Sequence, residues 1–297
     1  MQFHQSVAFL ETDQYLQMAA ASEELGFSGM YVSDHLCYPK ELRSRYTYSP
    51  YEDGSPIWGP ESDWPDSWCV ISAMAAVTST LEFTTGVYIA PARDLVTVAK
   101  LVGTAAVLSG NRINMGVAAG WCKEEFDLTG QEFSDRGARL NDMIPALRAL
   151  WRSGWVEYHG THYDIPLMQV NPAPTQPVPV IIGGDSPPAL RRTAALGDGW
   201  VAARVLPPDE ALGQIDSVKA ALADVGRTLD GFRIFTTVAA QPEPDLIRRF
   251  EDAGATDWIC APWMVADQDA ERGYNSTIER KIELMEQFAD QVIGKAA

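Results

Sequence analysis

Residues 81–121 read LEFTTGVYIAPARDLVTVAKLVGTAAVLSGNRINMGVAAGW, and this stretch decides the fold. Residues 82–90 are rich in β-branched and aromatic types that favour a strand, and Pro91 ends it. Asp94 suits the N-cap of a helix, because apolar residues then recur at helical spacing as far as Leu108. Gly110 and Asn111 tolerate the left-handed conformation that ends a helix, and residues 112–118 predict a second strand. The stretch is therefore a β-α-β unit, from which parallel sheets are built.

The same plan returns along the chain as a helical stretch, a glycine and a β-rich run. These joints occur at Gly26, Gly110, Gly197 and Gly254, at intervals too irregular for a short-period repeat. Eight strands are predicted, centred on residues 6–9, 30–33, 83–89, 113–117, 178–182, 200–203, 234–238 and 258–261. Further helices are predicted at residues 13–25, 67–77, 134–151, 188–196, 209–225, 245–253 and 278–292. We expect an α/β fold, a TIM-like (β/α)8 barrel that forms a single domain over residues 1–297.

Composition limits the classes of partner. The 297 residues carry a net charge of −17, and a surface that negative repels nucleic acid and anionic membranes. The four cysteines, Cys37, Cys69, Cys122 and Cys260, form no C-x-x-C pair, which argues against a disulfide framework or a thiolate zinc site. No signal-peptide pattern or membrane-length apolar run is seen. We therefore expect a cytoplasmic protein without nucleic-acid or membrane partners.

Two predicted connections are longer than usual. Residues 36–66 are rich in tyrosine, tryptophan and proline, and their place after a strand predicts a lid over the barrel mouth. Residues 122–179 contain a helix and a predicted hairpin around His159-Gly160. The His159-x-x-His162 pair lacks a third ligand, so we interpret it as packing and expect no metal. Asn275-Ser276-Thr277 matches a glycosylation sequon but is more simply a helix start.

Two strand ends carry candidate chemistry. His35 follows the second strand, where it can point into the barrel mouth and move a proton, and Asp34 can anchor a ring or favour the imidazolium. The alternative is a structural Asp-His pair. The corner IGGDSPP at residues 182–188 offers backbone amides and a helix N-terminus to an anion, although such a corner is also an ordinary tight turn. Residues 116–120 offer a second close approach.

These motifs resemble the luciferase-like monooxygenase superfamily, most closely its branch that uses coenzyme F420, a deazaflavin. The matching segments cover most of the chain in order. They are YVSDH (31–35), FTTGVYIAP (83–91), LSGNRINMGVAAGW (108–121), EEFDLTGQEFSDRGARL (124–140), ALRALW (146–151), PVPVIIGGDSPPALRRTAALGDGW (177–200) and AGATD (253–257).

The resemblance implies a cofactor ring at the barrel mouth, with a bulged third strand and a non-proline cis peptide at Gly86-Val87 behind it. It also implies that His35 handles the proton and that Asp34 lies at the polar edge of the ring. The residues implied to bind the cofactor are Asp34, Gly86, Val87, Ala118, Ala119, Gly120, Trp121, Gly183, Gly184, Asp185 and Ser186.

Ala119 stands where luciferase proper has an arginine for the flavin phosphate, which favours F420 over FMN. Asp94 also departs from the family pattern, and the role of Arg93 stays open. We expect an F420-dependent oxidoreductase that transfers a hydride between deazaflavin and a small apolar or aromatic substrate, with Trp64 and Trp68 contacting that substrate.

Two alternatives stay open. One is an FMN-dependent monooxygenase whose flavin a partner reductase supplies reduced, and the other is a non-catalytic cofactor-binding barrel. An alanine-rich stripe at Ala73, Ala75 and Ala76, interpreted through the resemblance, predicts a homodimer.

Overall fold

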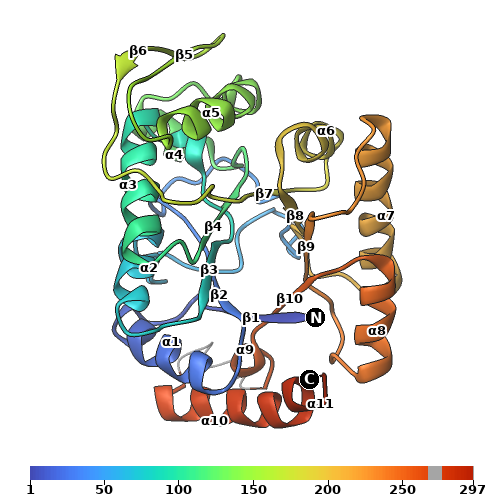
Figure 1. Cartoon of the computed structure of the whole chain (residues 1–297). Helices are drawn as coiled ribbons and strands as arrows, with labels where there is room; N and C mark the ends of the chain where they lie inside the picture. The colour runs from blue at the N-terminus through green and yellow to red at the C-terminus, as the bar shows by residue number, and fades with distance from the viewer. Residues whose placement is uncertain (267–275, 297) are drawn as a thin grey trace.

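The computed structural model describes residues 1–266 and 276–296. Within them, eight parallel strands form a closed barrel in the order β1-β10-β9-β8-β7-β4-β3-β2 (Figure 1), which confirms the predicted TIM-like fold. The barrel strands are β1 (Gln2–Ser6), β2 (Gly29–Val32), β3 (Glu82–Thr85), β4 (Ile113–Val117), β7 (Val180–Gly183), β8 (Gly199–Val201), β9 (Arg233–Thr236) and β10 (Asp257–Cys260).

Helices surround the barrel. They are α1 (Tyr15–Glu24), α2 (Ser67–Ala75), α3 (Leu95–Leu108), α4 (Lys123–Thr129), α5 (Arg136–Leu150), α6 (Pro187–Leu196), α7 (Pro208–Asp224), α8 (Pro244–Ala253), α9 (Pro262–Ala266), α10 (Ile278–Phe288) and α11 (Gly294–Ala296). Short helical turns lie at Thr12–Gln14, Ala90–Ala92 and Ala289–Ile293.

Local signals behave as the sequence indicates. Asp94 accepts a hydrogen bond from the N–H of Thr97 at the start of α3, and Gly110 and Asn111 have φ values of 68° and 65° at its end. Pro145 lies inside α5 and does not end it.

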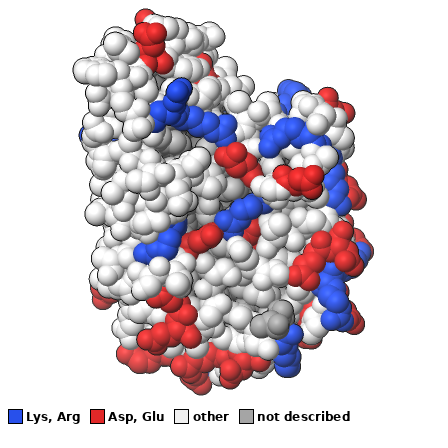
Figure 2. Space-filling model, in the orientation of Figure 1, with Lys and Arg blue, Asp and Glu red and all other residues white. Residues whose placement is uncertain are grey.

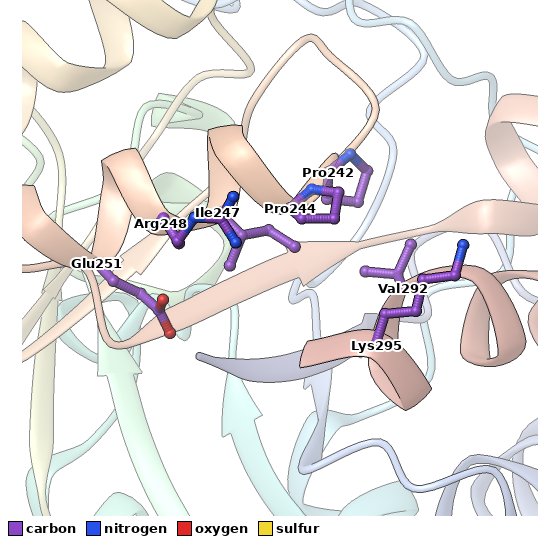
Figure 3. Close-up of a pocket in the computed structure, with 7 residues that line it drawn as sticks. All are labelled: Pro242, Pro244, Ile247, Arg248, Glu251, Val292 and Lys295. Atoms are coloured by element: carbon purple, nitrogen blue, oxygen red, sulfur yellow. The ribbon is translucent and has the colours of Figure 1, made fainter. Parts of the chain in front are cut away.

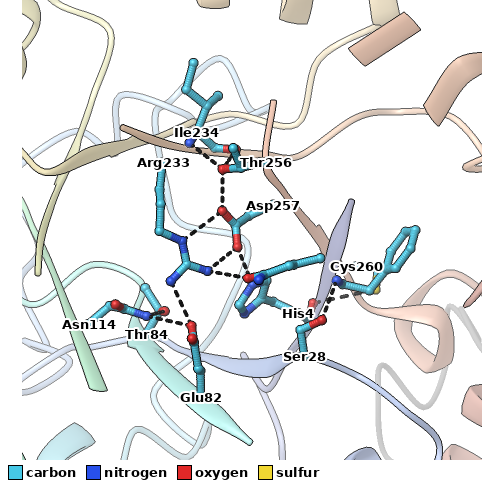
Figure 4. A network of polar contacts seen from close by, with 12 residues as sticks. His4, Ser28, Glu82, Thr84, Asn114, Arg233, Ile234, Thr256, Asp257 and Cys260 are labelled. Carbon is cyan, nitrogen blue, oxygen red and sulfur yellow. Dashed lines mark hydrogen bonds and ion pairs between the residues drawn. The ribbon is translucent and has the colours of Figure 1, made fainter. Parts of the chain in front are cut away.

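The first strand is four residues earlier than predicted, and this prediction was wrong. β1 spans Gln2–Ser6. Its residues His4 and Gln5 are polar although they are fully buried, so the apolar pattern that marks most strands is missing there. His4 Nε2 lies 2.7 Å from Oδ1 of Asp257, and Arg233 binds both Asp257 and Glu82 (Figure 4). We call these four charged or polar residues, His4, Glu82, Arg233 and Asp257, the basal network. They lie at the N-terminal end of the barrel strands.

The third strand is shorter than predicted. β3 ends at Thr85, and the peptide bond between Gly86 and Val87 is cis, as the resemblance implied. The chain rejoins the sheet at Tyr88, whose N–H donates to the carbonyl of Gly116 at 2.8 Å. The strand pattern in residues 86–89 therefore marks an interrupted strand rather than a continuous one.

The long segment after β4 contains the predicted hairpin. Strands β5 (Val156–His159) and β6 (Asp164–Met168) are antiparallel and stand beside α5 at the top of Figure 1. His159 pairs with Asp164 across this hairpin. Among the described residues, no group of three His, Cys, Asp or Glu side chains is placed to hold a metal ion.

The outer surface shows where the acidic side chains of the last long helix lie and tests two smaller predictions. The acidic residues of α10 face solvent along the lower edge of the molecule (Figure 2). Thr277 caps α10 by accepting from the N–H of Arg280, as a helix start requires, while Asn275 lies outside the described residues. Ala73 and Ala76 are exposed, but Ala75 is buried, so the outward stripe was wrong at that position, and the homodimer stays a prediction. No helix in the described part of the chain has the length and apolarity to span a membrane.

Glu23, in the last turn of α1, supports the loop that leads into β3. Its carboxylate accepts hydrogen bonds from the N–H groups of Ser79, Thr80 and Leu81 at 2.6–3.0 Å. Although burial acts to raise the pKa of Glu23, these hydrogen bonds lower that pKa to about 2. Because the pKa in the folded protein lies below the ordinary glutamate value of 4.5, this stabilisation is present above pH 4.5 and is lost as the pH falls toward about 2.

We expect Glu23→Ala to lower the free energy of unfolding by about 1–2 kcal/mol at pH 7. The difference from wild type should shrink steadily as the pH is lowered from 4.5, since the wild-type carboxylate is then protonated. Urea unfolding at a series of pH values measures this, with the exposed neighbour Glu24→Ala as control. A difference that stays constant down to pH 3 would contradict the assignment.

Candidate active site

His35 lies at the C-terminal end of β2 and is held from one side by a carboxylate. Its Nδ1 is 3.0 Å from Oε1 of Glu125, and the two side chains are only 12% and 2% exposed. The rings of Trp58, Trp64 and Trp121 lie beside the imidazole, with centroid separations of 4.8, 5.0 and 5.8 Å. The imidazole is therefore fixed in position by one hydrogen bond and by aromatic packing.

Sequence reasoning missed Glu125 as the partner of His35. Glu125 belongs to α4, a short helix that was not predicted, and it lies 90 residues further along the chain. The available signal was its position, because residues 124–125 follow directly after the corner at the end of β4, where side chains meet those of neighbouring strands.

Asp34 has a different partner from the one expected. It does not bind His35; instead it forms a two-pronged ion pair with Arg93 at 2.7 and 2.8 Å and accepts from the N–H of Ile89 at 3.0 Å. Burial raises the pKa of Asp34, and the guanidinium of Arg93 opposes that rise. Arg93, whose role was open, also lies over the ring of Tyr88 at 4.2 Å. Asp34 thus ties the end of β2 to residues 88–93, and its contact with a cofactor stays a prediction.

Three predicted segments converge on small side chains. A Cβ atom at Gly183 would lie 2.8 Å from Cγ1 of Val87 and 3.6 Å from Cβ of Ala118. Gly86 and Val87 are half-buried rather than enclosed, and so is Ala118. We call Gly86, Val87, Ala118 and Gly183 the small-residue cradle. It brings the ends of β3, β4 and β7 together.

The neighbouring positions 119–121 and 184–186 border the small-residue cradle. Ala119, Gly120 and Trp121 are half-buried, and Gly184 has a φ of 113°, a conformation that favours glycine. Ser186 accepts from the N–H of Ala189 and caps α6, as expected. These positions agree with a binding edge, and their contact with a cofactor stays a prediction.

Asp185 is already paired within the protein. It binds Arg204, from the loop after β8, at 2.6 Å and Gln214 at 3.1 Å. Arg204 was not singled out in the sequence, although it follows a barrel strand as His35 does. The pair places one cation and one anion at the corner predicted to receive an anion.

Residues 36–66 cover His35 and are attached at several points. The N–H of Leu36 donates to Glu125 at 2.8 Å, and those of Arg43 and Ser44 donate to Glu124 at 2.7 and 3.0 Å. Tyr46 packs on Trp58 and Trp121, with ring centroids 5.0 and 5.1 Å away. This arrangement fits the predicted lid, and we use that name for residues 36–66 below.

The two predicted substrate contacts differ in position. Trp64 is half-buried beside His35, where a substrate can reach it. Trp68 is only 1% exposed and packs edge-on against Tyr88 in the core, so the prediction that it contacts substrate was wrong. Asp66 caps the N-terminus of α2, two residues before Trp68, and this start of the helix turns Trp68 inward.

A separate surface pocket lies between α8 and the C-terminal helices (Figure 3). Glu251 in this pocket pairs with the amino group of Met1 at 2.5 Å. None of the predicted site residues lines it. The candidate site is therefore the barrel mouth around His35.

This closed (β/α)8 barrel carries an imidazole and a small-residue cradle at the C-terminal ends of its strands. It therefore belongs to the class of (β/α)8 barrel proteins whose site lies at that end. The profile of the luciferase-like monooxygenase family matches residues 4–284, and the chain belongs to that family.

The chain is 34% identical to an uncharacterised protein of Mycobacterium tuberculosis over 99% of this chain and 100% of that one. It is 24% identical to the F420-dependent hydroxymycolic acid dehydrogenase of Mycobacterium tuberculosis, over 86% of this chain and 72% of the relative. The structure of the coenzyme F420-dependent tetrahydromethanopterin reductase from Methanopyrus kandleri superposes with a TM-score of 0.73 at 14% identity, covering 100% and 99% of the two chains.

Proposed function

We propose that this protein is an oxidoreductase that uses coenzyme F420 and transfers a hydride between the deazaflavin and a small apolar or aromatic substrate. The hydroxymycolic acid dehydrogenase to which the chain is similar is F420-dependent, which supports the choice of cofactor. The observation that carries the proposal is the His35–Glu125 pair at the C-terminal ends of the strands, the end of the barrel where the small-residue cradle also lies.

The residues present fit such a ring. A Cβ atom at Gly183 would lie 2.8 Å from Cγ1 of Val87, so only a residue without a side chain lets β7 approach Val87 this closely. Ala119 brings no charge, the cations Arg93 and Arg204 are paired with Asp34 and Asp185, and Arg136 donates to the carbonyl of Gly120 at 2.9 Å. The lack of an arginine at position 119 supports F420 over FMN, because the terminal phosphate of FMN would lose its usual charged partner there.

The mechanism assigns separate tasks to the chain's own residues. The small-residue cradle would hold the cofactor ring, and a bound deazaflavin supplies the hydride chemistry. His35 moves the accompanying proton through Nε2, because Nδ1 is occupied by Glu125. Tyr46, Trp58 and Trp64 in the lid exclude water from the imidazole and form an apolar wall against which a substrate packs.

Titration with the two reduced cofactors tests the choice of cofactor. We expect reduced F420 to bind at least about tenfold more tightly than reduced FMN, which is about 1.4 kcal/mol, measured by quenching of tryptophan fluorescence. Gly183→Val should abolish this binding, since its side chain would occupy the small-residue cradle. Gly213→Val is the matched control, because a Cβ there meets no other atom within 4 Å.

Tighter binding of FMN would contradict the proposal and favour a flavin-dependent monooxygenase supplied by a reductase. F420 binding without turnover of any compound in a broad panel of alcohols, ketones and aromatic carbonyls would favour a non-catalytic barrel.

A further inference from the structure

We propose that Glu125 is a positioning residue, which fixes the tautomer of His35 and links that orientation to the seating of the lid. This inference rests on the proposed function only for the claim that His35 carries a proton. The hydrogen bonds that support it are a property of the protein alone and can be measured without cofactor.

The geometry at Glu125 selects one tautomer. Oε1 of Glu125 lies 3.0 Å from Nδ1 of His35. A carboxylate only accepts hydrogen bonds, so the neutral imidazole has to carry its proton on Nδ1. Nε2 then holds the lone pair and can accept a proton, and in the imidazolium form it can donate one.

Other acidic groups near Glu125 do not replace it. The titratable neighbours are Asp34, Cys37, Cys122 and Glu124. Asp34 is bound to Arg93, and Glu124 accepts from the lid backbone, so Glu125 is the carboxylate within hydrogen-bond distance of His35 among the described residues. The tryptophan rings on the other sides limit rotation of the imidazole.

The same oxygen joins the imidazole to the lid. Oε1 of Glu125 also accepts the N–H of Leu36, the first residue of the lid, at 2.8 Å. When the lid lifts from α4 and breaks this bond, the backbone beside His35 moves with it. Glu124 binds the lid further along, at Arg43 and Ser44, and does not contact His35. Glu124 therefore only attaches the lid, whereas Glu125 both attaches the lid and orients the imidazole.

The tautomer can be read directly from the imidazole 15N chemical shifts of the full chain, which contains four histidines. At a pH where His35 is neutral, we expect the Nδ1–H tautomer in wild type and in Glu124→Ala. Glu125→Ala should shift the population toward Nε2–H. His35→Asn assigns the signal. An Nε2–H tautomer in wild type would overturn the proposal even if Glu125→Ala fails to fold, and so would an unchanged tautomer in a folded Glu125→Ala.

Kinetics supply the second measurement. Glu125→Gln keeps an acceptor for the N–H of Leu36 but removes the charge. We expect it to lower kcat about 10- to 100-fold, with KM little changed. Glu124→Ala removes the acceptor for the N–H groups of Arg43 and Ser44, so it should raise KM more than it lowers kcat. A loss of kcat in Glu125→Gln no larger than in Glu124→Ala would contradict the positioning role. Because the tautomer is measured without cofactor, it stands independently if the proposed function fails.

Discussion

His35→Ala is expected to lower turnover about 10²- to 10⁴-fold while the affinity for the cofactor stays close to that of wild type. The imidazole is the titratable side chain enclosed by Trp58, Trp64 and Trp121, and its removal takes away the group that moves the proton. The small-residue cradle lies on other strands and keeps its shape. Steady-state kcat and a binding titration on the same preparation separate the two effects.

His159→Ala is the matched control for this substitution. His159 lies on the exposed β5–β6 hairpin, outside the barrel mouth, with a side chain that is 65% exposed. Its loss should leave kcat and KM within about twofold of wild type, since surface changes rarely alter more than local structure. Full turnover in His35→Ala would remove the imidazole from the proposed mechanism.

Arg93→Met is expected to lower the free energy of unfolding by about 3–5 kcal/mol. Asp34 and Arg93 are 1% and 10% exposed, so removal of the guanidinium leaves a carboxylate buried without its counter-ion. Asp34 then keeps the hydrogen bond that it accepts from the N–H of Ile89. Urea unfolding at pH 7 gives the size of the effect.

Two further variants test the cause of that loss. Adding Asp34→Asn to Arg93→Met should restore part of the stability, because the unpaired charge is then gone. Arg43→Met removes the exposed pair with Glu41, whose side chains are 84% and 79% exposed, and should cost little. A loss below about 1 kcal/mol in Arg93→Met would mean that the ion pair does not hold the ends of β2 and β3 together.

The sequence predicts the barrel well because its signals are local. Asp94 and Ser186 cap their helices, and Gly110 ends α3, since each residue acts on backbone groups a few positions away. The family resemblance adds the cis peptide at Gly86-Val87, which no local pattern encodes. His35 follows from the rule that barrel sites lie at strand ends, and the members of the small-residue cradle are residues that the resemblance implied.

The remaining details depend on contacts between distant residues. In β1, His4 binds Asp257 and Gln2 accepts from Arg233, contacts that no local pattern predicts, so the strand was predicted too late in the chain. Likewise, the sequence places Asp34 next to His35, but in three dimensions Arg93 takes Asp34 and Glu125 takes His35. Pairings of this kind depend on which strand ends meet.

The basal network has a consequence for ligand traffic. It places charged groups that are bound to one another at one end of the barrel, with His4 and Asp257 fully buried, so we expect ligands to enter from the opposite end. In the proposed function, cofactor and substrate then share a common route beneath the lid. Two molecules that share one route cannot exchange independently, and we expect them to bind in a fixed order and to leave in the reverse one.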